Sequence, residues 1–100
     1  MRSLDLQSMT EKTAILIVDN DPDDCAFIQH AFATVNEACR LAFLHSGFAL
    51  LDHLVTLEPE DLPDLIVLDY NMPELNGSET LKQLKDNPFI AHIPVLVYST

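Results

Sequence analysis

The chain has 100 residues, of which 48% are hydrophobic, and this suits one globular domain with a buried core. Its 16 acidic residues outnumber its 5 Lys and Arg, which gives a formal net charge of −11. A polyanion of this kind repels nucleic acid and anionic lipid, so we expect a protein that binds neither. No apolar run approaches the length of a membrane span and no signal core is visible, so we predict a cytoplasmic protein.

The chain begins with a polar stretch that precedes the first predicted strand. Residues 1–12 are aperiodic, and we expect them to form a flexible leader before a domain that spans residues 13–100. The apolar run at 14–18 is short, continuous and rich in branched residues. Such a run is typical of a strand that is buried on both faces of a parallel sheet.

An acidic segment follows this strand and leads into a predicted helix. The run stops at Asp19, after which Asp21 can cap a helix whose first position is Pro22. We assign Asp23 and Asp24 to the first turn, where acidic side chains favour the helix dipole. The capping interpretation therefore covers every acid of this segment except Asp19.

The rest of the chain alternates strands with helices. Apolar runs predict three further strands at 41–44, 65–68 and 94–98, and the proline-containing segment 58–64 is predicted to be a loop. Helices are predicted to start at Gly47 and, with a capping pair, at Asn76. This alternation predicts an α/β fold, a doubly wound parallel sheet with right-handed crossovers.

Polar side chains follow three of the predicted strands, at Asp19, Asp69 and Ser99. The active site of a parallel sheet lies beyond the carboxyl ends of its strands, so we expect these three side chains to converge. Clustered carboxylates repel one another, and Mg²⁺ is a divalent ion that would neutralise them. A carboxylate beside such an ion can attack a phosphoryl donor, and a nearby hydroxyl can then hydrogen-bond the phosphoryl oxygens.

Other residues give weaker signals. Tyr70 and Tyr98 adjoin the predicted site, and we interpret both as packing residues. Cys25 and Cys39 have neither metal-ligand spacing nor a disulfide framework, so we expect two reduced thiols. The chain has only 2 glycines, which is too few for a dinucleotide fingerprint or a P-loop.

Three motifs resemble those of response-regulator receivers, the phospho-accepting domains of two-component signalling, which have a flavodoxin-like fold similar to that of the chemotaxis regulator. They lie at 15–22, at 66–77 (IVLDYNMPELNG) and at 93–99. The resemblance covers residues 13–100 and implies the strand order 2-1-3-4 for the four predicted strands. The family's fourth helix, fifth strand and fifth helix have no counterpart, so the resemblance implies a truncated domain.

The resemblance also implies roles for individual residues. Asp69 would be the phospho-acceptor and Ser99 the switch hydroxyl. The implied metal ligands are Asp19, Asn20, Asp69 and Asn71. The family's acidic pair is usually two carboxylates, so Asn20 in the second position predicts weak binding of Mg²⁺.

The implied partner is a sensor histidine kinase or a phosphotransfer protein that supplies the phosphoryl group. Without a fifth strand, the fourth strand would be an exposed apolar edge, which predicts self-association. We therefore predict a signalling domain and not an enzyme.

Two alternatives stay open. A pseudo-receiver that is not phosphorylated and acts as a protein-interaction module is favoured by Asn20 and by the absence of the family's phosphate-clamping Lys. A phosphatase of the haloacid-dehalogenase type would use Asp19 as nucleophile and Asp21 as acid, but it leaves the motif at 66–77 unexplained.

Overall fold

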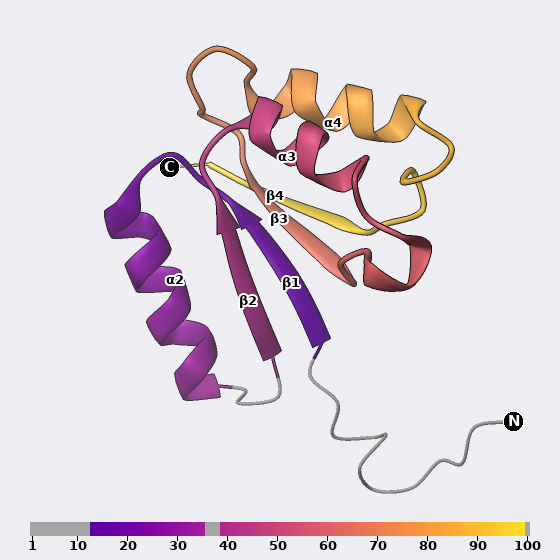
Figure 1. Cartoon of the computed structure of the whole chain (residues 1–100). Helices are drawn as coiled ribbons and strands as arrows, with labels where there is room; N and C mark the ends of the chain where they lie inside the picture. Colours follow the sequence, from indigo (N-terminus) through magenta and orange to yellow (C-terminus); the bar gives the residue numbers. More distant parts are fainter. Residues whose placement is uncertain (1–12, 36–38, 100) are drawn as a thin grey trace, which may run out of the picture.

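The computed structural model describes residues 13–35 and 39–99, so the predicted leader at residues 1–12 lies outside the described residues. Four strands form one parallel sheet in the order β2-β1-β3-β4 (Figure 1). The strands are β1 (Thr13–Val18), β2 (Cys39–Leu44), β3 (Leu65–Asp69) and β4 (Val95–Tyr98). The predicted α/β fold and the strand order 2-1-3-4 are confirmed.

Helices connect the strands within the described residues. They are α2 (Pro22–Val35), α3 (Gly47–Leu54), α4 (Gly77–Asp86) and the short 3₁₀ helix η1 (Pro59–Asp61). The helix starts predicted at Pro22 and Gly47 are confirmed, and the η1 turn lies inside the segment predicted to be a loop. A proline in its first turn favours this single helical turn, since its φ is already helical.

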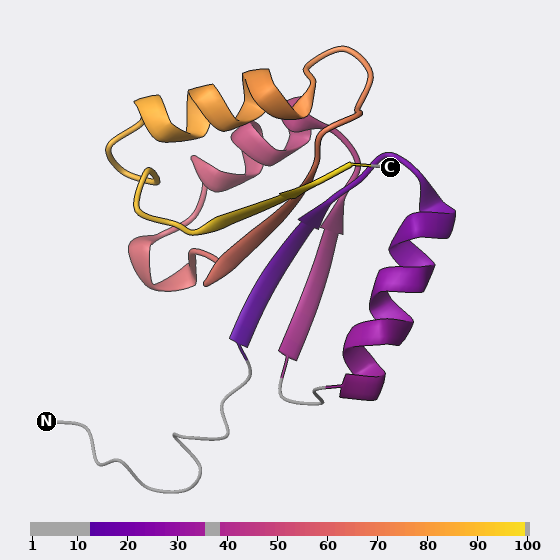
Figure 2. The same cartoon turned by 180° about the vertical axis from the view of Figure 1, so that it is seen from behind.

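The sheet is covered on both faces by these helices. Side chains alternate along a strand, so β1 and β3 each contribute to two apolar clusters. One cluster packs with α3 and α4, and the other packs with α2 (Figures 1 and 2). The strand residues of the first cluster are Leu16, Val18, Ile66 and Leu68, and those of the second are Ile15, Ile17 and Val67.

Helix α4 begins against the end of β3. Its capping box is complete, because Asn76 accepts from the backbone of Glu79 and the Glu79 side chain accepts in return. Gly77 N donates to the carbonyl oxygen of Tyr70 at 3.0 Å. A Cβ at Gly77 would lie 2.5 Å from Tyr70 Cα and 2.9 Å from the carbonyl oxygen of Asp69, so this approach requires glycine.

Candidate functional site

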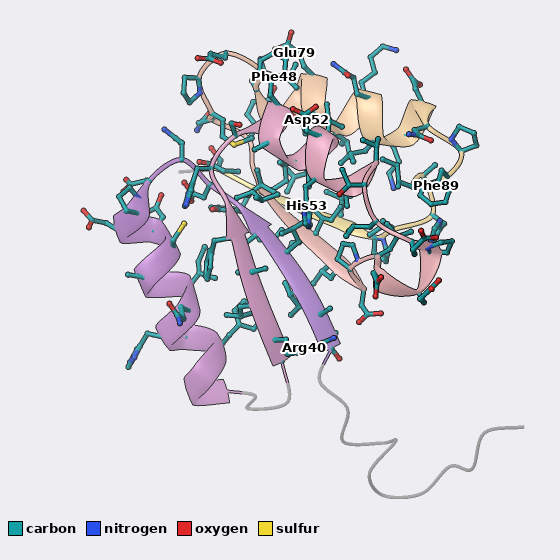
Figure 3. The ribbon with its side chains drawn as sticks, viewed as in Figure 1. Arg40, Phe48, Asp52, His53, Glu79 and Phe89 are labelled. Carbon is teal, nitrogen blue, oxygen red and sulfur yellow. The ribbon has the colours of Figure 1, made fainter. Side chains whose placement is uncertain are left out.

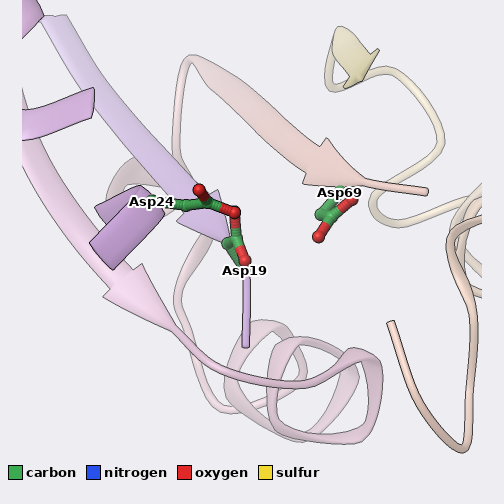
Figure 4. A group of neighbouring side chains, drawn as sticks. All are labelled: Asp19, Asp24 and Asp69. Carbon is green, nitrogen blue, oxygen red and sulfur yellow. The ribbon is translucent and has the colours of Figure 1, made fainter. Parts of the chain in front are cut away.

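Two aspartates stand side by side where neighbouring strands end. Asp19 follows β1 directly and Asp69 is the last residue of β3, and β1 pairs with β3. Both residues are buried, with exposed fractions of 0% and 1%. The structure therefore brings these two predicted site residues together at the carboxyl edge of the sheet (Figure 4).

A third carboxylate joins them from helix α2. Ligand oxygens of Asp19, Asp24 and Asp69 all lie within 4.8 Å of one another (Figure 4). Asp24 is the third residue of α2, and at that position a side chain can turn back toward the residue before the helix. From the sequence alone, we assign Asp24 only to a favourable interaction with the helix dipole. Asp24 lies three residues after the capping residue Asp21, and this spacing could have indicated that its side chain turns back toward the end of β1.

Asp24 is held in a strongly negative environment. Partial burial, followed by the negative charges of Asp19 and Asp21, raises the pKa of the Asp24 carboxyl above its ordinary value. Asp21 itself is exposed and caps the helix, since Asp23 N donates to Asp21 Oδ1 at 2.9 Å.

Asn71 connects the predicted acceptor with the predicted switch hydroxyl. Its backbone N–H donates to Asp69 Oδ1 at 3.0 Å, and its side-chain Nδ2 donates to Ser99 Oγ at 2.9 Å. Both Asn71 and Ser99 are exposed, so these two side chains lie between the buried Asp69 carboxylate and the surface. The structure thus places Asp69, Asn71 and Ser99 in one chain of hydrogen bonds.

Tyr98 reaches the site from the edge strand β4. Its hydroxyl donates to Asp19 Oδ2, and Asp19 Oδ1 accepts from Asp21 N at 2.9 Å. Burial, then the hydrogen bond to Asp19 and the nearby negative charges, raise the pKa of the Tyr98 phenol well above its ordinary value. Sequence reasoning interpreted Tyr98 as a packing residue and missed this contact.

The donor set fits a hard divalent cation. Carboxylate oxygens are the ligands that Mg²⁺ and Mn²⁺ prefer, and three of them converge here. The Lys and Arg side chains of the described residues lie elsewhere. Lys82 pairs with Asp86, Lys85 donates to backbone carbonyls after α4, and Arg40 is the second residue of β2, near the amino end of that strand (Figure 3). Asn20, the remaining predicted ligand, is exposed directly after Asp19.

Known proteins share this fold and these motifs. The family model described as response regulator receiver domain matches residues 15–100. The chain belongs to this family. Response regulator Rcp1 of Synechocystis is 34% identical over an alignment of 89 residues, and the match covers 86% of this chain and 60% of Rcp1. The polar-differentiation response regulator DivK of Brucella ovis is 35% identical over 85 residues, which are 85% of this chain and 63% of DivK.

The receiver also resembles solved structures of response regulators. The Mn²⁺-bound form of Rcp1 superposes with a TM-score of 0.77 at 32% identity, covering 88% of this chain and 66% of that one. The phosphorylated cyanobacterial phytochrome response regulator RcpA gives a TM-score of 0.77 at 32% identity, covering 89% and 66%. This receiver therefore has the fold of a two-component signalling domain.

The chain spans only part of its relatives. A probable cyclic di-GMP phosphodiesterase of Vibrio cholerae is 35% identical over 96 residues, but these are 20% of that protein, and the Rcp1 match covers 60% of Rcp1. The name phosphodiesterase describes that longer protein as a whole. Within the described residues, no helix combines the length and apolar character that crossing a membrane requires.

Proposed function

We propose that this receiver accepts a phosphoryl group on Asp69 from a histidine kinase or phosphotransfer protein in a cytoplasmic phosphorelay. The observation that carries the proposal is the convergence of the Asp19, Asp24 and Asp69 carboxylates within 4.8 Å at the carboxyl edge of the sheet. Asp69 is the member next to Asn71 and Ser99, which offer hydrogen-bonding groups at the solvent side.

The reaction we propose is a transfer between two side chains. The Asp69 carboxylate attacks the phosphorus of a phosphohistidine, the P–N bond breaks, and the donor imidazole leaves with that electron pair. Ser99 is exposed beside Asn71, so its hydroxyl can donate to an oxygen of the new acyl phosphate.

A divalent ion is part of the proposal. Asp19, Asp24 and Asp69 would hold it, with Asn20 and the carbonyl of Asn71 as further oxygen donors. When bound, the ion neutralises clustered negative charge and phosphoryl oxygens. We propose that Asp24 supplies a carboxylate that Asn20 lacks, and that Mg²⁺ still binds this receiver more weakly than it binds an Asn20→Asp variant.

Phosphorylation is tested by incubating the chain with acetyl phosphate and Mg²⁺ and mapping the phosphate by mass spectrometry. We expect a phosphate on Asp69 and none in Asp69→Asn. The matched control is Asp52→Asn, because Asp52 is exposed on α3 and is not one of the three clustered carboxylates, so its replacement should not change labelling (Figure 3).

The same experiment separates the alternatives. A phosphate on Asp19 would favour the phosphatase-type mechanism over the receiver mechanism. No phosphate from acetyl phosphate, phosphoramidate or a phosphohistidine protein, with a partner still bound, would favour the pseudo-receiver.

Self-association through β4 is also proposed. In the described residues β4 is an edge strand that pairs with β3 alone, and Leu96 and Val97 on it are 58% and 37% exposed. An apolar strand edge with unpaired backbone groups can pair with a second copy of the chain.

A further inference from the structure

Tyr98 crosses the sheet to reach a residue two strands away. It pairs in register with Asp69 on β3, and its ring packs in the cluster on the α2 face with Ile15, Ile17 and Val67. From there its hydroxyl donates to Asp19 Oδ2, beyond β3 and after the end of β1. One phenol therefore connects the edge strand to the carboxylate cluster.

Both oxygens of the buried Asp19 carboxylate already accept hydrogen bonds. Oδ1 accepts from Asp21 N at 2.9 Å and Oδ2 accepts from the Tyr98 hydroxyl. A hydrogen bond to a carboxylate stabilises its negative charge most when no other positive charge is near. A divalent cation bound to the cluster would neutralise that charge and draw electron density from the same oxygens. The hydrogen bond from the Tyr98 hydroxyl therefore stabilises the Asp19 carboxylate less when the ion is bound.

We infer that Tyr98 is a positioning residue that stabilises the metal-free arrangement of Asp19 and so competes with the divalent ion for Oδ2. The inference rests on the proposed metal site. Removing the hydroxyl destabilises the metal-free state more than the metal-bound state, and the ion then binds more tightly. By thermodynamic linkage, ion binding in turn weakens the hydrogen bond between Tyr98 and Asp19. The end of β4 is then less restrained, and the next residue there is Ser99.

The test compares Tyr98→Phe with the whole wild-type chain. Calorimetric titration with Mn²⁺ and with Mg²⁺ gives the affinities, and thermal unfolding in EDTA gives the metal-free stability. We expect Tyr98→Phe to unfold at a lower temperature in EDTA and yet to bind either ion about tenfold more tightly, the scale of one hydrogen bond to a charged group. A residue that only packs would lower stability without tightening ion binding.

Tyr70→Phe is the matched control. It removes the same hydroxyl from the neighbouring strand end, where the Tyr70 side chain is 48% exposed, and should leave both measurements unchanged. The chain has 2 tyrosines, so this control also leaves Tyr98 as its only one. If Tyr98→Phe does not fold, the near-ultraviolet difference spectrum of Tyr70→Phe on saturation with Mg²⁺ reports the same contact, and we expect the Tyr98 absorption to shift.

The outcomes separate two failures. The proposed role of Tyr98 is wrong if the wild type binds the ion and Tyr98→Phe binds it with equal or weaker affinity. It is also wrong if the spectrum of Tyr70→Phe does not shift. Either result leaves the proposed metal site intact. No binding of Mn²⁺ or Mg²⁺ to the wild type overturns the metal site and this inference together.

Discussion

Asp24 shows how the carboxylate cluster affects stability in the absence of a metal. Its pKa is raised in the folded chain above the ordinary value of 3.8, so the folded state binds this proton more tightly than the unfolded state does. The stability that this adds is complete below pH 3.8 and is lost as the pH rises through the raised pKa. At neutral pH the Asp24 charge therefore opposes folding.

Replacing Asp24 with Asn should reverse that effect. In EDTA at neutral pH we expect Asp24→Asn to be more stable than the wild type, with a smaller loss of stability between pH 4 and neutrality, as followed by urea unfolding. With saturating Mg²⁺ the order of stabilities should invert, because the variant should bind Mg²⁺ about tenfold more weakly or worse. Even residues that contact a metal only through its ligands have effects of that size. Equal Mg²⁺ affinity in both proteins would exclude Asp24 from the ligands.

Single residues differ in how far the sequence alone can place them. Asp19 and Asp69 are predictable, because each ends a short apolar run and parallel strands bring their carboxyl ends together. The role of Asp24 is harder to predict, since an acidic residue in the first turn of a helix also interacts favourably with the helix dipole. The contact between Tyr98 and Asp19 cannot be predicted from the sequence, because it joins residues 79 positions apart. It depends on the strand order, on the register of β4 and on which face of the sheet the Tyr98 side chain occupies.

At the scale of elements, the contact between α4 and β3 controls the position of Asp69. A methyl group at Gly77 would overlap Tyr70 Cα, so Gly77→Ala must push the start of α4 away from the end of β3. We expect a loss of about 1–3 kcal/mol in the free energy of unfolding, the usual range for overpacking. Urea unfolding measures it, and slower phosphorylation of Asp69 should accompany it.

The control for this change is the next residue of the same helix. Ser78→Ala alters an exposed side chain, and Ala is the better helix former, so we expect a change within about 0.5 kcal/mol. If Gly77→Ala were as stable as Ser78→Ala, the close packing of α4 on β3 would be wrong. Sequence reasoning predicted the start of α4 from its capping pair, but nothing local reveals which backbone lies against Gly77.

At the scale of the whole molecule, the net charge of −11 opposes the proposed pairing of two copies through β4, which is an edge strand among the described residues. Two copies repel over roughly 8–10 Å at ordinary ionic strength, and added salt shortens that range. We therefore expect self-association, measured by light scattering, to increase as salt increases. Leu96→Lys should abolish it, because Leu96 is 58% exposed on the edge strand and a charge there opposes strand pairing.

A second lysine variant separates edge pairing from net charge. Phe27 is 65% exposed on α2, so Phe27→Lys changes the net charge equally but leaves the β4 edge intact. We expect this variant to associate as the wild type does. A monomer at every salt concentration in the wild type would contradict pairing through β4.

The acidic site has a consequence for sulfur chemistry. The Cys25 thiol lies buried on α2 and donates to the carbonyl oxygen of Asp19 at 3.6 Å. Burial, followed by the negative charges of Asp19 and Asp24, raises the pKa of this thiol. The thiolate is the nucleophile that attacks peroxides and disulfides, so the negative charges of the proposed metal site also disfavour the reactive form of this sulfur. An oxidant that reaches the proposed phosphorylation site should therefore leave Cys25 unmodified, although its sulfur lies 3.6 Å from the carbonyl oxygen of Asp19.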